Sequence, residues 1–223
     1  MSIIEVFGEE CRATAAVLNG LPEQDFARQT NCPPWSLKEL VVHTRFSVTI
    51  PDPLPAPAAN AKLCEAADYY RRPERDSDEY RTDNIRITQE LAQRFPTGRS
   101  AATDFGRATQ NLIVRLHGED LGTLVRYGDS NALSLGDYLL TRLLALAAHS
   151  IDVAITLDQE PWTQSETARL LGPMLTSLLG REPPPALGWS LQDLLEIGTG
   201  RKRLSATERE QLGALSGAFP LIS

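Results

Sequence analysis

The stretch SLGDYLLTRLLALAAHSIDVAITL, residues 134–157, decides the fold of this chain. Its apolar residues recur at steps of three and four positions and no proline interrupts them, which is the pattern of a largely buried α-helix. Ser134, followed three residues later by Asp137, resembles a capping box and predicts where the helix begins. The sequence therefore predicts one long helix as the central element of the fold.

Few strongly polar side chains interrupt the apolar surface of this helix. Arg142 and His149 are seven residues apart and share one helix face, and Asp152 follows His149 by one turn. A histidine on such a helix is either a hydrogen-bonded core residue or part of a functional site. On this stretch alone both interpretations stay open.

A second histidine helix is predicted from NCPPWSLKELVVHTRFSV, residues 31–48. Ser36 and Glu39 form a capping box directly after two prolines, which is a strong signal for a helix start. His43 falls on the apolar side of this helix, and the pattern also places Phe46 toward the interior. Two histidines on the apolar sides of two helices favour a shared site.

Further helices and one β-prone segment complete the predicted fold. Apolar periodicity predicts helices over residues 3–19, 78–94, 101–116, 163–179 and 191–197, and a capping box of Ser205 and Glu208 opens a last one. Residues 123–127 are β-prone. This order predicts a mainly all-α protein, with an up-and-down four-helix bundle over residues 1–180 and a small C-terminal helical extension over residues 181–223.

Two segments between the helices have alternative interpretations. PDPLPAPAAN, residues 51–60, is rich in proline and is expected to lie extended, either as a linker or as the wall of a pocket. Tyr69 and Tyr70 precede RRPER, residues 71–75. Such an arginine cluster forms either a solvated face with local salt bridges or the rim of a pocket for an anionic ligand.

Composition narrows the class of partner. The 223 residues include 22 basic and 29 acidic ones, and the net charge of −7 argues against a nucleic-acid or membrane-surface partner. A small molecule is therefore the predicted partner, of a monomer or a homodimer. Cys11, Cys32 and Cys64 form no CxxC pair and are expected to be reduced. Without the pattern of a signal peptide or a membrane span, the chain is predicted to be cytoplasmic.

Four segments resemble, in the same order, the DinB-like superfamily, and within it the mycothiol-dependent maleylpyruvate isomerase-like group. These segments are CPPWSLKELVVHT around His43, YGDSNALSLGDYLLTRLLALAAHSIDVAITL around His149, EPWT after it, and LGWSLQDLLEIGTGRKRLSATE in the tail. The resemblance implies a four-helix bundle that binds a zinc-like divalent metal through three side chains. One is a histidine that matches His43, and the others form an E-x-x-x-H pattern whose histidine matches His149.

The glutamate of that pattern would stand at position 145, where this chain has Ala145. Alanine cannot ligate a metal, and two neutral imidazoles without the carboxylate hold a divalent cation much less tightly. The resemblance also has an aspartate at the position of Asp152, where it implies an orienting carboxylate. Ala145 therefore counts against a complete metal site, although His43 and His149 remain the ligands if a metal binds.

Three functions are compatible with these residues. The first is an enzyme that catalyses an isomerisation, cyclisation or elimination on an organic acid or polyketide-like metabolite without a metal. His149 or His43 would then exchange the proton, Arg142 would stabilise negative charge and Asp152 would orient an imidazole. The predicted substrate contacts are Ala145, Arg126, Tyr69 and Tyr70.

The second function, implied by the resemblance, is a metal- and mycothiol-dependent isomerase or S-transferase. The third is a non-catalytic binding protein with a vestigial site. In every case His43 and His149 are predicted to face one another across the bundle interior, with Ala145 on a cavity between them.

Overall fold

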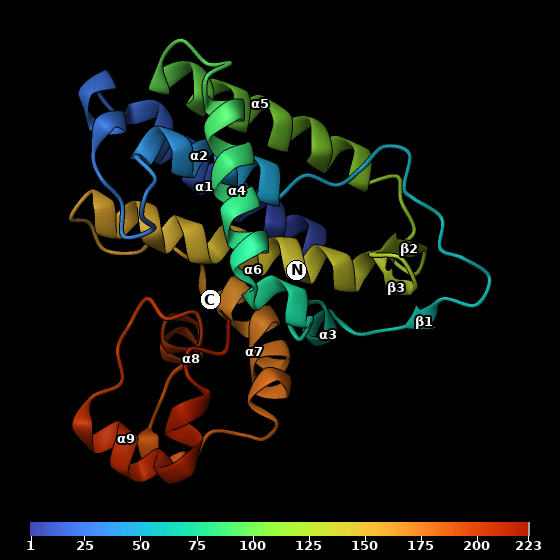
Figure 1. Ribbon diagram of the computed structural model, residues 1–223, viewed down its shortest axis with the longest axis vertical. Coiled ribbons are helices and arrows are strands. Elements are labelled where there is room, and N and C mark those ends of the chain that lie inside the picture. The colour runs from blue at the N-terminus through green and yellow to red at the C-terminus, as the bar shows by residue number, and fades with distance from the viewer. Residues whose placement is uncertain (223) are drawn as a thin grey trace.

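The computed structural model describes residues 1–222 and confirms the mainly all-α prediction (Figure 1). Its α-helices are α1 (Ile3–Gly20), α2 (Leu37–Ser47), α3 (Ala66–Tyr70), α4 (Asp78–Ala92), α5 (Gly98–Leu116), α6 (Leu135–Thr156), α7 (Ser165–Leu179), α8 (Leu191–Gly198) and α9 (Ala206–Leu212). Short 3-10 turns lie at Glu23–Ala27, Pro73–Asp76, Pro185–Leu187 and Gly213–Ala218. Helices α1 and α2 each pack against both α5 and α6, and these four helices form the bundle.

Helix α6 supplies the centre of the core. Its N-cap, Ser134, accepts a hydrogen bond from the Asp137 backbone, as the capping pattern predicts. Its side chains at Leu139, Leu143 and Leu146 are fully buried. By length and hydropathy alone α6 could cross a membrane, but 72% of its most apolar window is buried inside the described chain. It is the core helix of the bundle.

Helix α2 begins at the predicted capping box, in which Ser36 and Glu39 satisfy each other's backbone donors. Its buried residues are Leu37, Leu40, Val41, Val42 and Thr44. The prediction that Phe46 points inward is wrong, because its side chain is 47% exposed. Phe46 shares the helix side of the buried Val42, one turn earlier, but it borders the cavity described below and therefore stays partly exposed.

Helix α4 crosses α2 on the front of the bundle in Figure 1, and α5 returns after a short loop. Helix α5 ends at Leu116, and its C-cap is His117, whose ring Nδ1 lies 2.7 Å from the Ile113 carbonyl. A small sheet lies beside the start of α6, with strand order β1–β3–β2. Its strands are β1 (Lys62–Leu63), β2 (Leu124–Tyr127) and β3 (Asn131–Ser134), of which the sequence predicted β2 alone.

The C-terminal segment packs beside α7, at the bottom of the view in Figure 1. Helix α8 contributes Leu194 and Leu195 to the main core, whereas α9 covers a separate small apolar cluster. The chain then returns to the end of α8, where the backbone N–H groups of Leu221 and Ile222 donate to the Gly198 carbonyl at 2.7 and 3.2 Å. This return places Ile222 on the wall of the cavity described next.

Candidate functional site

A cavity of about 550 Å³ opens between α2, α3, α4 and α6. Its volume is that of a typical small-molecule site. Four predicted site residues on two helices line it, namely His43 from α2 and Arg142, Ala145 and His149 from α6. Tyr69 and Tyr70 from α3 also line it, together with Cys32, Trp35, Phe46, Ser47, Arg75, Tyr80, Arg81, Ile85, Tyr138, Arg201 and Ile222.

The two histidines meet inside this cavity. Their ring centroids are 5.0 Å apart, and the rings are nearly perpendicular. Ala145 precedes His149 by one turn of α6 and leaves only a methyl group on the wall beside the pair. The two rings nevertheless have different surroundings.

His43 has the environment of a core histidine. Its Nδ1 lies 3.2 Å from the Thr88 hydroxyl and its Nε2 lies 3.2 Å from the Ser47 hydroxyl. Its ring stacks on Trp35 with the centroids 4.3 Å apart. Burial, with the nearby His149 and Arg75, lowers the pKa of His43 to about 3. The imidazole is therefore neutral near pH 7, and both of its nitrogens are engaged.

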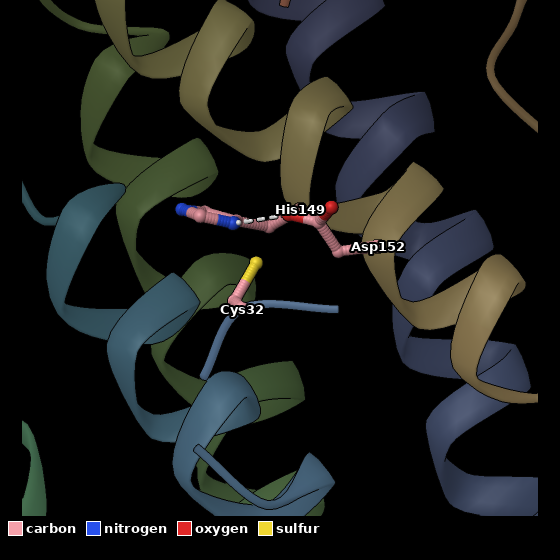
Figure 2. Close-up of side chains that lie close together, drawn as sticks. All are labelled: Cys32, His149 and Asp152. Carbon is pink, nitrogen blue, oxygen red and sulfur yellow. Dashed lines mark hydrogen bonds and ion pairs between the residues drawn. The ribbon is translucent and has the colours of Figure 1, made fainter. Parts of the chain in front are cut away.

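His149 pairs with a fully buried carboxylate. Its Nδ1 lies 3.0 Å from Asp152 Oδ2. Figure 2 shows this contact as a dashed line between the two side chains. Asp152 also accepts a hydrogen bond from Asn31 at 2.7 Å and two from Arg201, at 3.0 and 2.6 Å. Burial alone would raise the pKa of Asp152, but the His149 hydrogen bond and the Arg201 charge outweigh it and hold that pKa well below its usual range.

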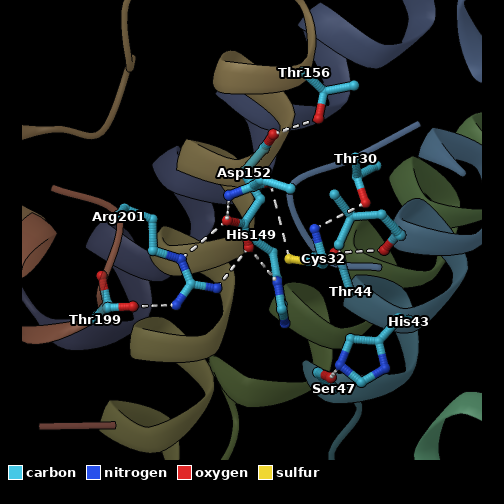
Figure 3. Close-up of polar contacts among 12 residues, drawn as sticks. Thr30, Cys32, His43, Thr44, Ser47, His149, Asp152, Thr156, Thr199 and Arg201 are labelled. Atoms are coloured by element: carbon cyan, nitrogen blue, oxygen red, sulfur yellow. Dashed lines mark hydrogen bonds and ion pairs between the residues drawn. The ribbon is translucent and has the colours of Figure 1, made fainter. Parts of the chain in front are cut away.

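The state of Asp152 fixes the tautomer of His149. An ionised carboxylate can only accept hydrogen bonds, so the proton of a neutral His149 lies on Nδ1. The lone pair is then on Nε2, and it faces away from Asp152 (Figure 3). His149 is thus arranged as a base at the cavity wall.

Arg201 is a site residue that the sequence did not reveal. It lies after α8, 49 residues beyond Asp152, and pairs with it at 2.6 Å. Its remaining Nη1 donates to the Thr199 carbonyl, so all three guanidinium nitrogens have partners. No spacing rule connects these two positions, and only the resemblance of the tail segment pointed to this region.

Cys32 is the second unexpected neighbour. Its Sγ and ligand atoms of His149 and Asp152 all lie within 4.8 Å of one another (Figure 2). Burial, reinforced by the Asp152 charge, raises the pKa of the Cys32 thiol to about 12. The thiol is therefore protonated at neutral pH.

Arg142 and the tyrosines form the other end of the cavity. Arg142 is 8% exposed, and its Nη1 donates to the Ser47 carbonyl at 2.9 Å. Its guanidinium lies 4.9 Å from the Tyr69 ring centroid and 4.6 Å from that of Tyr138. The Tyr70 hydroxyl donates to the Thr141 carbonyl at 2.8 Å, so Tyr70 mainly secures α3 to α6.

Arg126 is not brought to this cavity, which corrects its prediction as a substrate contact. It lies on β2, where alternation turns Val125 and Tyr127 inward and leaves Arg126 exposed. Its backbone N–H donates to the Pro55 carbonyl at 2.8 Å. The proline-rich segment therefore packs on the sheet beside Arg126.

The family model described as mycothiol maleylpyruvate isomerase N-terminal domain matches residues 7–154. The match covers α1 to α6 and includes both histidines and Asp152. A comparison with curated proteins gives no match, and neither does a comparison with solved structures.

Proposed function

Because the chain belongs to the mycothiol maleylpyruvate isomerase N-terminal domain family, we propose that it is a small-molecule enzyme that moves a proton on an organic acid. The reaction class is an isomerisation, cyclisation or elimination that needs no metal. The observation that carries this proposal is the pair of His149 and Asp152, which leaves Nε2 of His149 as a base at the cavity wall.

The residues of the pair and their neighbours have distinct proposed roles. Asp152 orients the imidazole and stabilises the cation that forms when His149 takes a proton. Arg201 keeps Asp152 ionised and in place through two hydrogen bonds. His43 is engaged by two hydroxyl groups, so it shapes the cavity and does not exchange the proton.

The charge of the cavity supports an anionic substrate. Its lining includes Arg75, Arg81, Arg142 and Arg201, and no aspartate or glutamate lines it among the side chains that the structure describes. The whole chain nevertheless carries a net charge of −7. A cationic cavity in an anionic protein attracts small anions and stabilises negative charge that develops on a substrate oxygen.

Two features argue against the three-ligand metal site that the family resemblance implies. Ala145 offers no ligand atom, and Asp152 cannot replace the missing glutamate, because its carboxylate oxygens already accept four hydrogen bonds, which is about their full capacity. The positive charge of Arg201, 2.6 Å from Asp152, would also repel a cation. The residues present therefore do not fit that metal site.

Proton transfer can be tested before the natural substrate is known. The protein is incubated in D2O with 2-oxo, 3-oxo and α,β-unsaturated acids, and deuterium incorporation or isomerisation is followed by NMR. His149→Gln should lower the rate by ~100-fold to ~10,000-fold, which is the usual cost of losing a general base. His43→Gln is the matched control within the cavity and should lower stability while leaving turnover of the folded fraction nearly unchanged.

If the His149→Gln protein melts several degrees lower but turns over at the parental rate, His149 is a structural core histidine and not the proposed base. Absence of any turnover with the whole panel would favour the non-catalytic alternative.

The metal- and thiol-dependent alternative has one observation in its favour, the closeness of Cys32, His149 and Asp152 in a family described by mycothiol. Elemental analysis of protein purified without a histidine tag separates the two proposals. Near-stoichiometric metal would support the alternative and overturn a metal-free reaction.

A further inference from the structure

Arg142 is a buried cation with neutral hydrogen-bond partners, the Thr141 hydroxyl and the Ser47 carbonyl. It is 8% exposed, and no carboxylate of the described side chains lies within salt-bridge distance of it. Arg201, the other arginine deep in the site, is by contrast paired with Asp152. Neutral partners leave its positive charge without a described carboxylate to balance it, so an arginine in this position at a cavity wall is suited to bind an anion.

A second arginine, Arg75, lies beside the Tyr69 ring at the same end of the cavity. The guanidinium carbons of Arg75 and Arg142 lie 5.0 and 4.9 Å from its ring centroid, and both arginines line the cavity. Burial would raise the pKa of the Tyr69 hydroxyl, but the charges of Arg142 and Arg75 outweigh it and lower that pKa. We call Arg142, Arg75 and Tyr69 the cationic end of the cavity.

The opposite end offers no second charge to a ligand. Both ring nitrogens of His43 are engaged by the hydroxyl groups of Thr88 and Ser47, and the charges of Asp152 and Arg201 balance. The three guanidinium nitrogens of Arg201 are engaged by Asp152 and the Thr199 carbonyl. The lining also includes the apolar side chains of Trp35, Ile85 and Ile222 and the uncharged polar ones of Cys32 and Asn84.

Arg81 does not add a second buried cation. Its side chain is 66% exposed and pairs with Asp78 at 3.3 Å on the surface of α4. Exposed pairs of this kind are screened by solvent and contribute little. The cavity therefore has one strong cationic end and one uncharged end.

Ser47 contacts one residue at each end of the cavity, Arg142 and His43. Its carbonyl accepts from Arg142 at 2.9 Å, and its hydroxyl lies 3.2 Å from Nε2 of His43. Along α6, Arg142 and His149 are seven residues apart, about 10 Å at 1.5 Å per residue. A ligand anchored at Arg142 must extend along this wall to reach His149.

We propose that the cavity selects a monoanion with an apolar planar body and rejects dicarboxylates. The single carboxylate or enolate is held by Arg142, with Tyr69 and Arg75, and the body lies against Trp35 and Ile222 beside His149. This inference rests on the proposed function and names the substrate class of the same site. A second carboxylate would have to lose its water at the uncharged end, where no cation is available to replace it.

Two acids of matched structure test this selection. Trans-cinnamate and fumarate share a propenoate unit, but one carries a phenyl group where the other carries a second carboxylate. Isothermal titration calorimetry should show cinnamate binding, with fumarate at least about tenfold weaker. Cinnamamide, which lacks the charge, should also bind at least about tenfold more weakly than cinnamate.

Substitutions locate the carboxylate. Arg142→Gln should weaken cinnamate binding at least about tenfold. Arg86→Gln changes an exposed arginine of α4 that pairs with Asp83 and Glu90, and this control should bind like the parent. Arg75→Gln, at a less buried position, provides a second variant with the same expected direction if Arg142→Gln does not fold.

The binding and turnover experiments distinguish a failure of the proposed monoanion subsite from a failure of the proposed proton transfer. His149→Gln should still bind cinnamate at least about tenfold more tightly than fumarate even when it has lost proton transfer. Equal affinity for fumarate and cinnamate, no binding of cinnamate, or unchanged binding by folded arginine variants would overturn the monoanion subsite. Loss of turnover in His149→Gln would in those cases still support the proposed enzymatic function.

Discussion

At the scale of single residues, the candidate site depends most on Asp152. This carboxylate is fully buried, and it is tolerated there because four hydrogen bonds and one guanidinium charge stabilise its ionised form. Removal of one partner from a buried ion pair costs more than the pair itself contributes, because the remaining charge stays buried. Arg201 is therefore as important to stability as to the geometry of His149.

Arg201→Gln removes two of the four donors to Asp152 together with the positive charge. We expect the free energy of unfolding at pH 7 to fall by about 3–5 kcal/mol, measured by urea denaturation. Arg86→Gln, which breaks an exposed pair, should change it by less than about 1 kcal/mol. A loss from Arg201→Gln as small as that of the control would contradict the role of Arg201.

The lowered pKa of Asp152 also predicts a pH dependence. A carboxyl whose pKa is depressed by folding contributes stability that is present above its unfolded pKa of about 3.9, and this contribution is lost as the pH falls toward the folded pKa. Arg201→Gln reduces the depression, so its stability should fall less steeply between about pH 5 and pH 2 than that of the parent. Identical slopes would show that Arg201 does not set the pKa of Asp152.

Ala145→Glu tests the metal interpretation at one position. The substitution places a carboxylate four residues before His149, and the zinc affinity should rise at least about tenfold, because a third protein ligand completes a common zinc coordination set. Ala145→Gln has nearly the same size but an amide, and it serves as the control in calorimetric titrations with zinc. Equal zinc affinity of both variants and the parent would show that position 145 does not face the two histidines as a ligand.

At the scale of secondary-structure elements, helix α5 contains two glycines in opposite environments. A Cβ atom added to Gly98 would lie 2.1 Å from the Phe26 ring, whereas one added to Gly106 would meet its nearest neighbour, the Cβ of Ala15, at 3.6 Å. Gly98 therefore allows the start of α5 to pack directly on an aromatic side chain. Gly106 has no such packing role.

Gly98→Ala and Gly106→Ala should thus change stability in opposite directions. The first should destabilise the protein by about 1–3 kcal/mol, because the Phe26 ring must move. The second should stabilise it by about 0.5–1 kcal/mol, since alanine is the better helix former. Thermal and urea unfolding of the two variants measure both effects, and the same sign for both would contradict the packing of Phe26 on α5.

The sequence predicted what is decided locally and missed what depends on tertiary packing. The capping boxes at Ser36 and Ser205 formed as expected, because they involve residues three positions apart. The strand β1 has only two residues and exists through its pairing with β3, so it has no pattern of its own. Phe46 was misplaced because the cavity that leaves its side chain partly exposed depends on how α2 packs with other helices.

The candidate site shows the same division. His149, Asp152 and Arg142 were predicted because they share one helix, and His43 because it repeats the pattern on another. Arg201 and Cys32 were not predicted as site residues, since they reach the cavity from loops that no periodicity connects to α6. Arg126 was predicted for its charge, but strand alternation turns it away from the cavity.

At the scale of the whole molecule, two regions of the chain build the cavity. The family match covers residues 7–154, whereas Arg201 and Ile222 come from beyond it. The matched region carries the histidines, and the C-terminal segment supplies the partner of Asp152 and part of the apolar wall. Members of the family that differ in this segment would therefore keep the helices and present a different cavity to the substrate.

The separation of 49 residues between Asp152 and Arg201 has a consequence for biosynthesis. Chains are made from the N-terminus, and their early parts fold while later parts are still being translated. Helix α6 therefore leaves the ribosome with its carboxylate before the guanidinium that balances it exists. A nascent chain that pauses between these positions carries His149 without a firmly held orienting partner, so the arrangement of the candidate site is complete only after Arg201 has been translated.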